Sequence, residues 1–456
     1  MLRYYLALWI AKLSIIALKI THHNGTNFPG VVAFKICPNF LKYAKKPSKI
    51  IGVTGTNGKT TVTNMLIDML KANGQIILDN NKGSNTVTGI ITSIVIGSTI
   101  FGKMKYDTAV FEIDERSTRL IFQYLNPNYL IVNNLTRDSI MRNGHPEFIS
   151  KIITKYMPES TKLILNGDDL IAATVAPNNE RVYFGIDRLE GDVTECINLI
   201  NDMQICPKCN TVLKYEYLRY HHIGKAYCPN CDFKSPAVDY LGCNVDTDNM
   251  TIYIVNKGNS HTYRLLNDSV FNIYNVVAVV ACFKELGYKD ADIESLLEHI
   301  EIVKSRYEVV QVGKYRIIKQ MSKDRNALGS SRAFDYIAGL DGNKELILMM
   351  NNLSDNNTWS ENVCWLYDCD FEFLNKDNIK NIICTGPRAK DYFLRLKYAG
   401  VDDSVISIVG DELSAPDKLK LVDAEDVYVL FGTDSIELAD KVVEKSKKVM
   451  LERGNI

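Results

Sequence analysis

At 456 residues, the chain is long enough for roughly three domains, each with its own core. Its hydrophobic fraction of 46%, charged fraction of 23% and formal net charge of −1 are those of an ordinary globular protein and argue against a broadly basic nucleic-acid surface. Eleven cysteines in a chain of this length, with no cleavable signal, indicate the reducing cytosol rather than a disulfide-bonded scaffold.

The first twenty residues are apolar enough to raise the question of a membrane segment. Lys12 interrupts them, so neither half supplies the ~20 apolar residues that a membrane-spanning helix needs. Residues 1–67 contain no Asp or Glu. The spacing predicts a helix that either packs on the protein core or lies on an anionic membrane surface, and the sequence leaves both alternatives open. Its apolar stripe, flanked by Lys12 and Lys19, consists of Leu2, Leu6, Trp9, Leu13, Ile16 and Ile20.

A glycine-bearing loop follows a short β-branched run at residues 50–53, and helical periodicity begins at Thr60. Strand, glycine loop and helix in this order predict a phosphate-binding loop, because the glycines let backbone N–H groups converge on phosphate oxygens. Lys59 is expected to reach the β- and γ-phosphates and the Thr60 hydroxyl to bind Mg²⁺. Val53 stands where such loops usually have their first glycine. The predicted nucleotide-binding residues are Gly55, Thr56, Asn57, Gly58, Lys59, Thr60 and Thr61.

Three further apolar runs, at residues 108–113, 129–132 and 162–165, predict buried strands that alternate with helices. This pattern is typical of a doubly wound parallel sheet, in which ligands bind at the carboxyl ends of the strands. Each run ends in acids or amides, and carboxylates at that edge could hold Mg²⁺. The polar strand ends are Glu112 with Asp114 and Glu115, residues 133–138, and residues 166–169.

Two Cys-Pro-x-Cys pairs, separated by eighteen residues, predict a four-cysteine zinc site. Four thiolates leave no position for a catalytic water, so the expected role is structural. His221 and His222 lie between the pairs and are spare ligands at most. The zinc ribbon is expected to be an insertion at about residues 192–240. The predicted zinc ligands are Cys206, Cys209, Cys228 and Cys231.

After the insertion, a helix is predicted to place Asn272 and Asn275 on one side, where they could contact an adenine edge or serve as capping or core residues. Alternating strands and helices resume after a boundary near Glu301 and predict a second, smaller Rossmann-like domain. The expected domains are a lead-in segment at 1–48, a central domain at 49–300 and a C-terminal domain at 301–456.

Together these motifs resemble one family, the Mur ligases, and within it the MurT group. The loop at 55–61 is similar to the family's ATP loop, and the acidic strand end at 111–115 to its second-strand motif. The cysteine insertion, the short segment before the loop in place of a UDP-sugar domain, and the motif at 386–391 are similar to MurT ligases in particular. Further matches are residues 134–138, residues 166–169, Asn272, Asn275 and Arg306.

The resemblance implies a central α/β P-loop-type domain with a parallel sheet and a Rossmann-like C-terminal domain. It implies a ligase that uses ATP and Mg²⁺ to phosphorylate the α-carboxylate of D-glutamate in the lipid II stem peptide and then amidates it to D-isoglutamine. A glutaminase subunit of the GatD type would supply the ammonia, and no nucleic acid is expected as a partner. The expected location is the cytoplasm, with contact to the inner face of the membrane left open.

The resemblance also assigns roles to individual residues. Lys59, Glu112 and Glu115 are expected to act in phosphoryl transfer, while Asn272, Asn275 and Arg306 match positions at which the family contacts the nucleotide or joins its last domain. The segments after Asp138 and around Lys323 depart from the family pattern, which leaves their roles open.

One predicted residue serves the partner rather than the ATP site. Asp355, in a polar loop after a strand, is expected to complete the Cys–His pair of the glutaminase. Asp368 and Asp370 are its rivals, although they lie in a more apolar segment.

Two other functions are weighed against amidation. A Mur-type ligase could add an amino acid instead of ammonia, but the zinc ribbon and the motif at 386–391 count against it. A nucleotide-dependent interaction module without chemistry is a second alternative, and the strand-end acids beside the ATP loop count against that.

Overall fold

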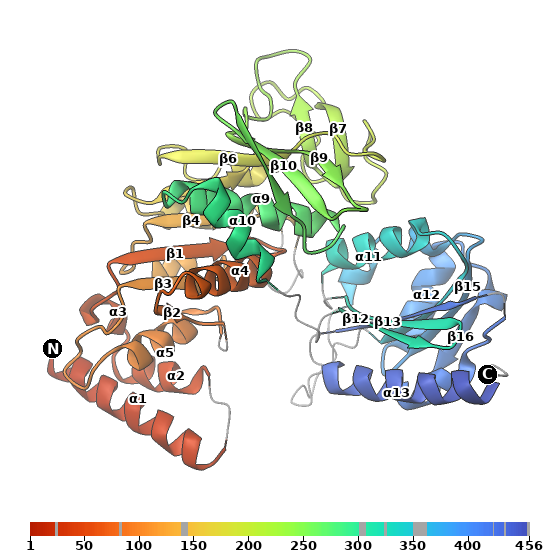
Figure 1. Cartoon of the computed structure of the whole chain (residues 1–456), viewed down its shortest axis with the longest axis horizontal. Helices are drawn as coiled ribbons and strands as arrows, with labels where there is room; N and C mark the ends of the chain where they lie inside the picture. The colour runs from red at the N-terminus through yellow and green to blue at the C-terminus, as the bar shows by residue number, and fades with distance from the viewer. Residues whose placement is uncertain are drawn as a thin grey trace. The chain divides into compact units, whose positions relative to one another are not determined.

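The computed structural model describes residues 1–22, 26–81, 84–137, 145–300, 307–322, 326–349, 363–422, 424–432 and 435–453. It divides into two compact units, the first holding nearly all described residues up to 300 and the second those from 307 onward. In Figure 1 the first unit runs from red to green and the second from teal to blue.

The first unit is built on a nine-stranded sheet with the strand order β11-β10-β9-β6-β5-β4-β1-β3-β2, in which β1 lies between β4 and β3. The strands from β2 to β9 in this order are parallel to one another. β10 pairs antiparallel with both of its neighbours, β9 and β11. The predicted parallel sheet is therefore confirmed. The strands are β1 (Lys49–Thr54), β2 (Ile77–Asp79), β3 (Thr108–Glu112), β4 (Tyr129–Val132), β5 (Lys162–Asn166), β6 (Arg181–Ile186), β9 (Tyr240–Asp246), β10 (Thr251–Asn256) and β11 (Asn259–Arg264).

Helices cover both faces of this sheet, because its central strands are apolar on both sides. The helix after the glycine loop, α4, begins at Lys59, one residue before the predicted start, and ends at Ala72. The helices of the first unit are α1 (Leu2–Ile20), α2 (Phe28–Ile36), α3 (Phe40–Tyr43), α4 (Lys59–Ala72), α5 (Val87–Gly97), α6 (Thr118–Ile121), α7 (Pro146–Tyr156), α8 (Leu170–Ala173), α9 (Val270–Glu285) and α10 (Asp290–Glu298).

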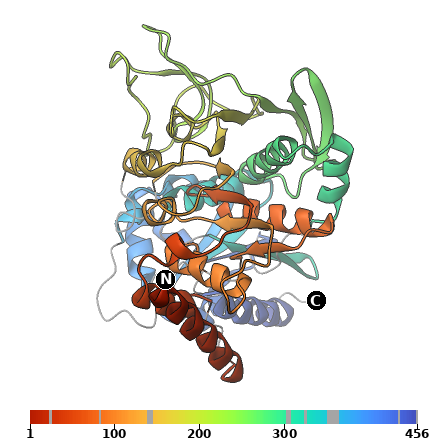
Figure 2. The same cartoon turned by 90° about the vertical axis from the view of Figure 1, so that its left-hand side faces the viewer.

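Helix α1 forms an outer layer over α2 and α5 (Figures 1 and 2). It packs through one face, where the small side chains of Ala7 and Ala11 allow close approach. The stripe predicted from the sequence lies on the opposite face and is exposed. The helix therefore packs on the unit, but not through the stripe that the sequence singled out, and contact of that stripe with a membrane stays a prediction. Among the described residues, no helix is both long and apolar enough to cross a bilayer.

An insertion separates two neighbouring parallel strands, since the chain leaves the sheet after β6 and returns as β9 beside it. Within the insertion, β7 (Lys214–Tyr220) and β8 (Ile223–Tyr227) form an antiparallel hairpin. The predicted cysteine pairs flank this hairpin on either side.

The second unit contains a six-stranded sheet of order β12-β13-β17-β14-β15-β16, parallel except for the β12–β13 hairpin. Apolar clusters lie on its two faces, as expected for a sheet covered by helices on both sides. Its elements are β12 (Tyr307–Val312), β13 (Tyr315–Met321), α11 (Ala327–Gly339), β14 (Lys344–Met349), β15 (Ile379–Thr385), α12 (Ala389–Tyr398), β16 (Ile406–Val409), β17 (Asp426–Phe431) and α13 (Ile436–Arg453), with 3₁₀ turns at Cys364–Tyr367, Phe371–Leu374, Asp403–Val405 and Glu412–Lys418.

Candidate active site

The glycine loop connects the carboxyl end of β1 to the first turn of α4. Gly55 and Gly58 have φ angles of +132° and +81°, in the region that favours glycine. A Cβ at Gly58 would clash with the side-chain amides of Asn133 and Asn275. Both positive φ and close approach therefore require glycine at residue 58. A loop of this geometry at a helix N-terminus fits a phosphate group.

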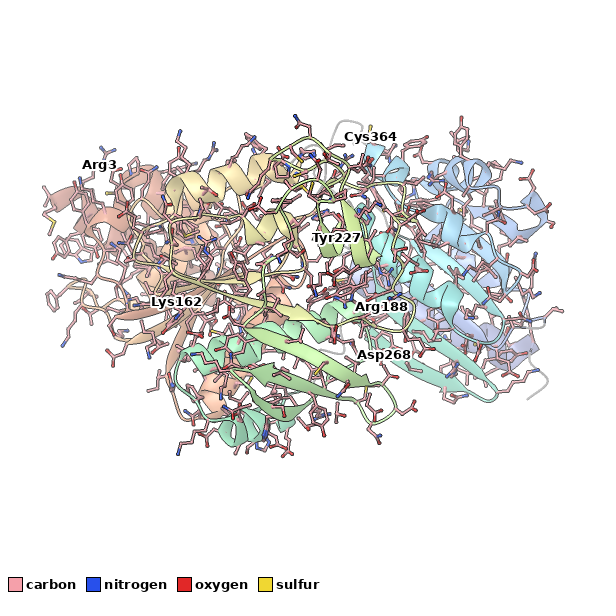
Figure 3. The ribbon with its side chains drawn as sticks, turned by 90° about the horizontal axis from the view of Figure 1, so that it is seen from above. Arg3, Lys162, Arg188, Tyr227, Asp268 and Cys364 are labelled. Atoms are coloured by element: carbon pink, nitrogen blue, oxygen red, sulfur yellow. The ribbon has the colours of Figure 1, made fainter. Side chains whose placement is uncertain are left out.

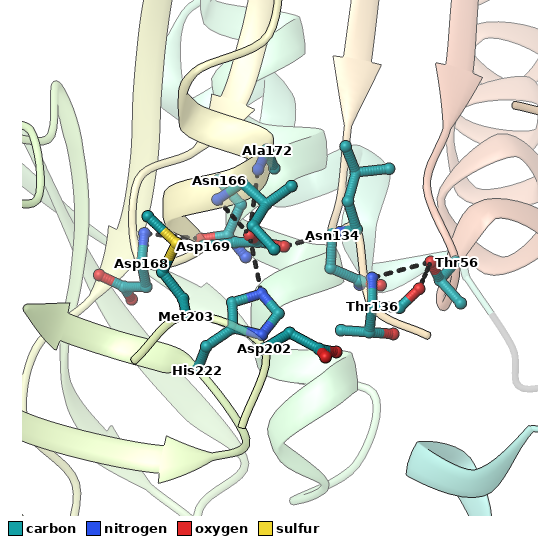
Figure 4. Close-up of polar contacts among 12 residues, drawn as sticks. Thr56, Asn134, Thr136, Asn166, Asp168, Asp169, Ala172, Asp202, Met203 and His222 are labelled. Atoms are coloured by element: carbon teal, nitrogen blue, oxygen red, sulfur yellow. Dashed lines mark hydrogen bonds and ion pairs between the residues drawn. The ribbon is translucent and has the colours of Figure 1, made fainter. Parts of the chain in front are cut away.

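The end of β4 holds this loop in place, because β4 pairs with β1 in parallel and ends beside it. The Thr56 N–H donates to the Asn134 carbonyl at 2.8 Å, and the Thr56 hydroxyl donates to the Thr136 carbonyl at 3.0 Å. The Asn134 side-chain amide binds the backbone of Asn57 twice: its oxygen accepts from the Asn57 N–H at 2.9 Å, and its nitrogen donates to the Asn57 carbonyl at 3.0 Å. Backbone carbonyls of the neighbouring strand end and the Asn134 side chain thus preorganise the loop, and Figure 4 shows the contact between Thr56 and Thr136.

Lys59 and Glu115, two predicted catalytic residues, lie together in the structure. The Lys59 Nζ is 2.7 Å from the Glu115 carboxylate and also donates to the Gly55 carbonyl. Both side chains are buried. Burial raises the pKa of the Glu115 carboxyl, and the Lys59 ammonium acts in the opposite direction. The pair keeps a cation inside the glycine loop.

Glu112 is placed differently from Glu115. It closes β3, and its carboxylate accepts a hydrogen bond from the Asn85 amide at 3.0 Å. Thr60 and Thr61 lie in the first turn of α4 and are partly exposed. Glu112 and Thr60 keep their roles as predictions.

Asn275 reaches the loop from α9, while Asn272 lies one turn earlier. Asn275 is buried and accepts from the Asn133 amide at 2.8 Å, and its own amide is 3.4 Å from the Asn272 Oδ1. Asn133 also donates to the Asn57 carbonyl at 2.9 Å, while its buried Oδ1 has no donor among the described residues. An orphaned acceptor beside a glycine cradle fits a nucleotide ligand. Sequence reasoning did not single out Asn133, although its place at the end of β4 could have identified it.

The two aspartates after β5 hold strand ends together. The Asp169 carboxylate accepts from the Leu135 N–H at 2.6 Å and caps α8 through two backbone N–H groups. The Asp168 carboxylate accepts from the Ile186 N–H at 2.9 Å and from the Tyr274 hydroxyl at 2.7 Å. Because protein donors engage both carboxylates, these two acids position the edge of the sheet, and Mg²⁺ binding by strand-end carboxylates stays a prediction.

The inserted hairpin attaches to these same aspartates. His222 Nε2 lies 3.1 Å from the Asp169 carboxylate, with both side chains fully buried (Figure 4). Arg219 lies 3.0 Å from the Asp168 carboxylate and 3.3 Å from that of Asp192, and it bonds to the Tyr274 hydroxyl. His222 is therefore an anchor of the hairpin rather than a spare metal ligand. Neither its role nor that of Arg219 carries a signal in the sequence, because both depend on where the hairpin folds back.

The four predicted zinc ligands form one cluster, with their Sγ atoms within 4.8 Å of one another. Cys206 and Cys231 are 3.6 Å apart and Cys209 and Cys228 are 3.4 Å apart, measured between sulfur atoms. Four sulfurs at ~2.3 Å from a tetrahedral Zn²⁺ would be about 3.8 Å apart. The donor set and its dimensions fit a closed structural zinc site, and no other such group occurs among the described residues.

Several predicted residues lie outside the described residues, namely Asp355, Arg306, Asp138 and Lys323. Of the two rivals of Asp355, Asp370 is only 2% exposed, and its backbone N–H donates to the Ser331 hydroxyl. Burial raises the pKa of the Asp370 carboxyl. A buried carboxyl is a poor candidate for meeting a histidine of another subunit.

The chain matches two protein-family models and is similar in sequence to named relatives. The family model described as the Mur ligase middle domain matches residues 53–205, and the model described as MurT ligase C-terminal matches residues 324–433. A relative from Staphylococcus aureus (strain COL), named lipid II isoglutaminyl synthase (glutamine-hydrolyzing) subunit MurT, is 29% identical over 89% of this chain and 90% of its own. A relative of the same name from Streptococcus pneumoniae (strain ATCC BAA-255 / R6) is 28% identical over the same shares.

Solved structures show the same fold at lower identity. A pseudomurein peptide ligase type C from Methanothermus fervidus has a TM-score of 0.67 at 22% identity, covering 90% of this chain and 80% of that one. The MurF ligase from Thermotoga maritima, solved in complex with ADP, has a TM-score of 0.59 at 15% identity, covering 93% and 85%. The chain therefore carries matches to the Mur ligase middle domain and to the MurT ligase C-terminal domain, has the fold of the Mur ligases, and is similar over nine-tenths of its length to MurT ligase subunits.

Proposed function

We propose that this chain is the ATP-dependent ligase subunit that converts the D-glutamate of the lipid II stem peptide to D-isoglutamine. The observation that carries the proposal is the preorganised glycine loop at the end of β1, with the Lys59–Glu115 pair inside it. The relatives that match nine-tenths of the chain are named for this synthase, which supplies the substrate class.

The proposed reaction has two steps. The γ-phosphoryl group of ATP is transferred to the α-carboxylate, which forms an acyl phosphate and releases ADP. Ammonia then attacks the acyl carbon, the C–O bond to phosphate breaks, and the nitrogen loses a proton to give the amide and inorganic phosphate. Lys59 offsets negative charge on the transferred group, which is the main contribution a protein makes to phosphoryl transfer.

Different residues of the site would bind the phosphates and the metal ions. Backbone N–H groups of the loop from Gly55 to Lys59 would hold the phosphates, and Asn133 and Asn275 would line the site beside them. The Thr60 hydroxyl would hold Mg²⁺, which would supply positive charge to offset that of the phosphates. Zn²⁺, held by the four cysteines, would cross-link the two arms of the insertion and so fix the hairpin that carries His222.

Ammonia would come from a glutaminase subunit of the GatD type, since the relatives are named as subunits of a glutamine-hydrolysing synthase. Asp355 is proposed to complete the glutaminase Cys–His pair. An Asp355→Asn variant should then lose glutamine-dependent amidation and keep ammonia-dependent amidation. Loss of both activities would assign Asp355 to the ATP site or to the fold. The proposed location is the cytoplasmic face of the membrane, where a lipid-linked substrate would be presented.

The decisive experiment measures ADP release by the purified chain with lipid II, with and without ammonium, and follows the stem peptide by mass spectrometry. Ammonium-dependent turnover with conversion of the carboxylate to a carboxamide supports amidation. Turnover that requires an amino acid instead would assign the chain to peptide-bond formation, and nucleotide binding without turnover would contradict an enzymatic role.

A further inference from the structure

Helix α1 has two apolar faces, and only one of them is packed. Tyr4, Ala7, Leu8 and Ala11 are buried against the first unit. The opposite face forms one continuous stripe, because its members recur every three or four residues. The exposed stripe consists of Leu2 (84% exposed), Leu6, Trp9, Leu13 (63%), Ile16 (54%) and Ile20 (72%).

A turn from a distant part of the chain extends this stripe. The Trp9 indole N–H donates to the Ile100 carbonyl at 2.8 Å, and the backbone at Gly102 lies against the Tyr4 ring. Ile100 and Phe101, which this turn presents, are 58% and 77% exposed. We call the stripe together with Ile100 and Phe101 the α1 surface. Soluble proteins seldom expose so many large apolar side chains in one place without a binding function.

The charges around the α1 surface are basic. Residues 1–67 contain no acid, and neither do residues 99–106. Arg3, Lys19, Lys103 and Lys105 are exposed on these segments, and Figure 3 shows Arg3 at the outer edge of the unit. Exposed cations beside an apolar face match the composition of an anionic membrane surface.

Lys12, which also flanks the stripe, has an internal role. Its Nζ donates to the carbonyls of Val95 and Ser98, at 2.7 and 2.6 Å, at the end of α5. Burial and the nearby Lys105 lower its pKa. Lys12 therefore fastens α1 to α5, and reversing its charge would disturb packing rather than test a membrane contact.

We propose that the α1 surface docks on an anionic lipid bilayer, with the apolar stripe lying in the interface and the exposed cations near the headgroups. Trp9 suits this position, because its exposed ring is large and apolar and its N–H is already bonded to the Ile100 carbonyl. A second copy of the chain is a less suitable occupant, since a twofold contact would bring the same acid-free basic segments together. The link to catalysis rests on the proposed function, because a lipid-linked substrate lies in the same bilayer.

The test compares a stripe variant with a matched control in co-sedimentation with vesicles. Leu13→Gln together with Ile16→Gln removes two exposed apolar side chains while keeping good helix formers. Leu394→Gln together with Leu451→Gln makes the same change on exposed helical positions of the second unit, which are 44% and 49% exposed. Circular dichroism and thermal unfolding establish that each variant is folded.

Wild-type chain and control should bind vesicles containing anionic phosphatidylglycerol and release them as salt rises, whereas the stripe variant should bind at least about tenfold more weakly. Equal binding by the stripe variant, or no binding by the wild type, would overturn the proposal. A wild-type dimer that the stripe variant converts to a monomer would assign the surface to a second copy instead. Loss of binding to the glutaminase subunit would assign it to that protein.

Activity measurements separate this proposal from the proposed function. The stripe variant should amidate a water-soluble stem-peptide analogue like the wild type and lose activity only on lipid II in vesicles. Vesicle binding by a wild type that amidates neither substrate would contradict the proposed function and leave docking supported. Equal loss on both substrates would overturn the assignment of the stripe to membrane docking.

Discussion

Two buried cations of the first unit are held in different ways. Lys59 pairs with the Glu115 carboxylate and with carbonyls of its own loop. Arg219 bonds to the carboxylates of Asp168 and Asp192 and to the carbonyls of residues 186 and 187. It also lies over the Tyr217 and Tyr274 rings, 4.9 and 5.5 Å from their centroids.

The contrast follows from the chemistry of the two side chains. A lysine ammonium sits on a flexible stem and can move from a carboxylate to a phosphate, whereas a guanidinium with acceptors along several directions is fixed. We infer that Lys59 leaves Glu115 for a phosphate when a nucleotide binds. We infer that Arg219 keeps its contacts and so holds the insertion on the sheet. Substitutions at the two sites should therefore damage different properties.

The largest effect is expected at Lys59. Lys59→Ala should lower the rate of ADP release at least about a thousandfold, because charge stabilisation of the transferred phosphoryl group is lost. Stability should fall less, because burial already favours protonation of Glu115. Lys71→Ala serves as control, since Lys71 lies at the other end of α4, where it forms an ion pair at the surface with Asp79 of β2. A folded Lys59→Ala protein with normal turnover would contradict the proposed function.

Arg219→Met should act on stability instead. Removing the guanidinium leaves two carboxylates buried without their cation, which costs about 3 kcal/mol or more in the free energy of unfolding. Lys225→Met, which breaks an exposed pair with Glu216, should cost less than about 1 kcal/mol. Urea unfolding measures both. Equal free energies of unfolding for the two variants would show that the Arg219 contacts do not stabilise the attachment of the insertion.

Alanine substitutions at Gly58 and Gly74 distinguish the cost of a positive φ from the cost of a steric clash with neighbouring side chains. Their φ angles are +81° and +76°, but a Cβ at Gly74 would meet nothing within 4 Å. Gly74→Ala should cost about 1 kcal/mol of stability from backbone strain alone. Gly58→Ala should cost about 2 kcal/mol and also weaken ATP binding, because it displaces Asn133 and Asn275. Calorimetric titration with ATP checks the second effect, and unchanged affinity would mean that the loop does not hold the phosphates.

The smallest effect on the nucleotide site is expected from the metal cluster. Cys209→Ser should abolish bound zinc, measured by atomic absorption. It should also weaken ATP binding a few-fold, roughly 1 kcal/mol, because the hairpin that the cluster fixes contacts the strand ends, for example through His222 and Asp169. Cys243→Ser, at a half-buried cysteine outside the cluster, should keep its zinc. Undiminished zinc in the Cys209→Ser chain would rule out a four-thiolate site.

The sequence was informative wherever the signal is local or repeated at a fixed spacing. The central strands of the first sheet, the helix after the glycine loop, the cysteine pairs and the similarity to Mur ligases follow from such patterns, and the structure and the comparisons confirm them. The roles of Glu112, Thr60 and Asp355 stay predictions. The sequence could not show that Asp168 and Asp169, two of the strand-end acids, accept hydrogen bonds from distant parts of the chain.

The sequence by itself determined which segments form strands and helices and which residues can chelate or bind phosphate, because propensity, periodicity and ligand spacing are properties of neighbouring residues. Tertiary structure decided which partners they meet. It brought Glu115 to Lys59 and His222 to Asp169, and it turned one apolar face of α1 inward and left the other exposed. These outcomes depend on contacts between residues that are tens of positions apart, and no local pattern encodes them.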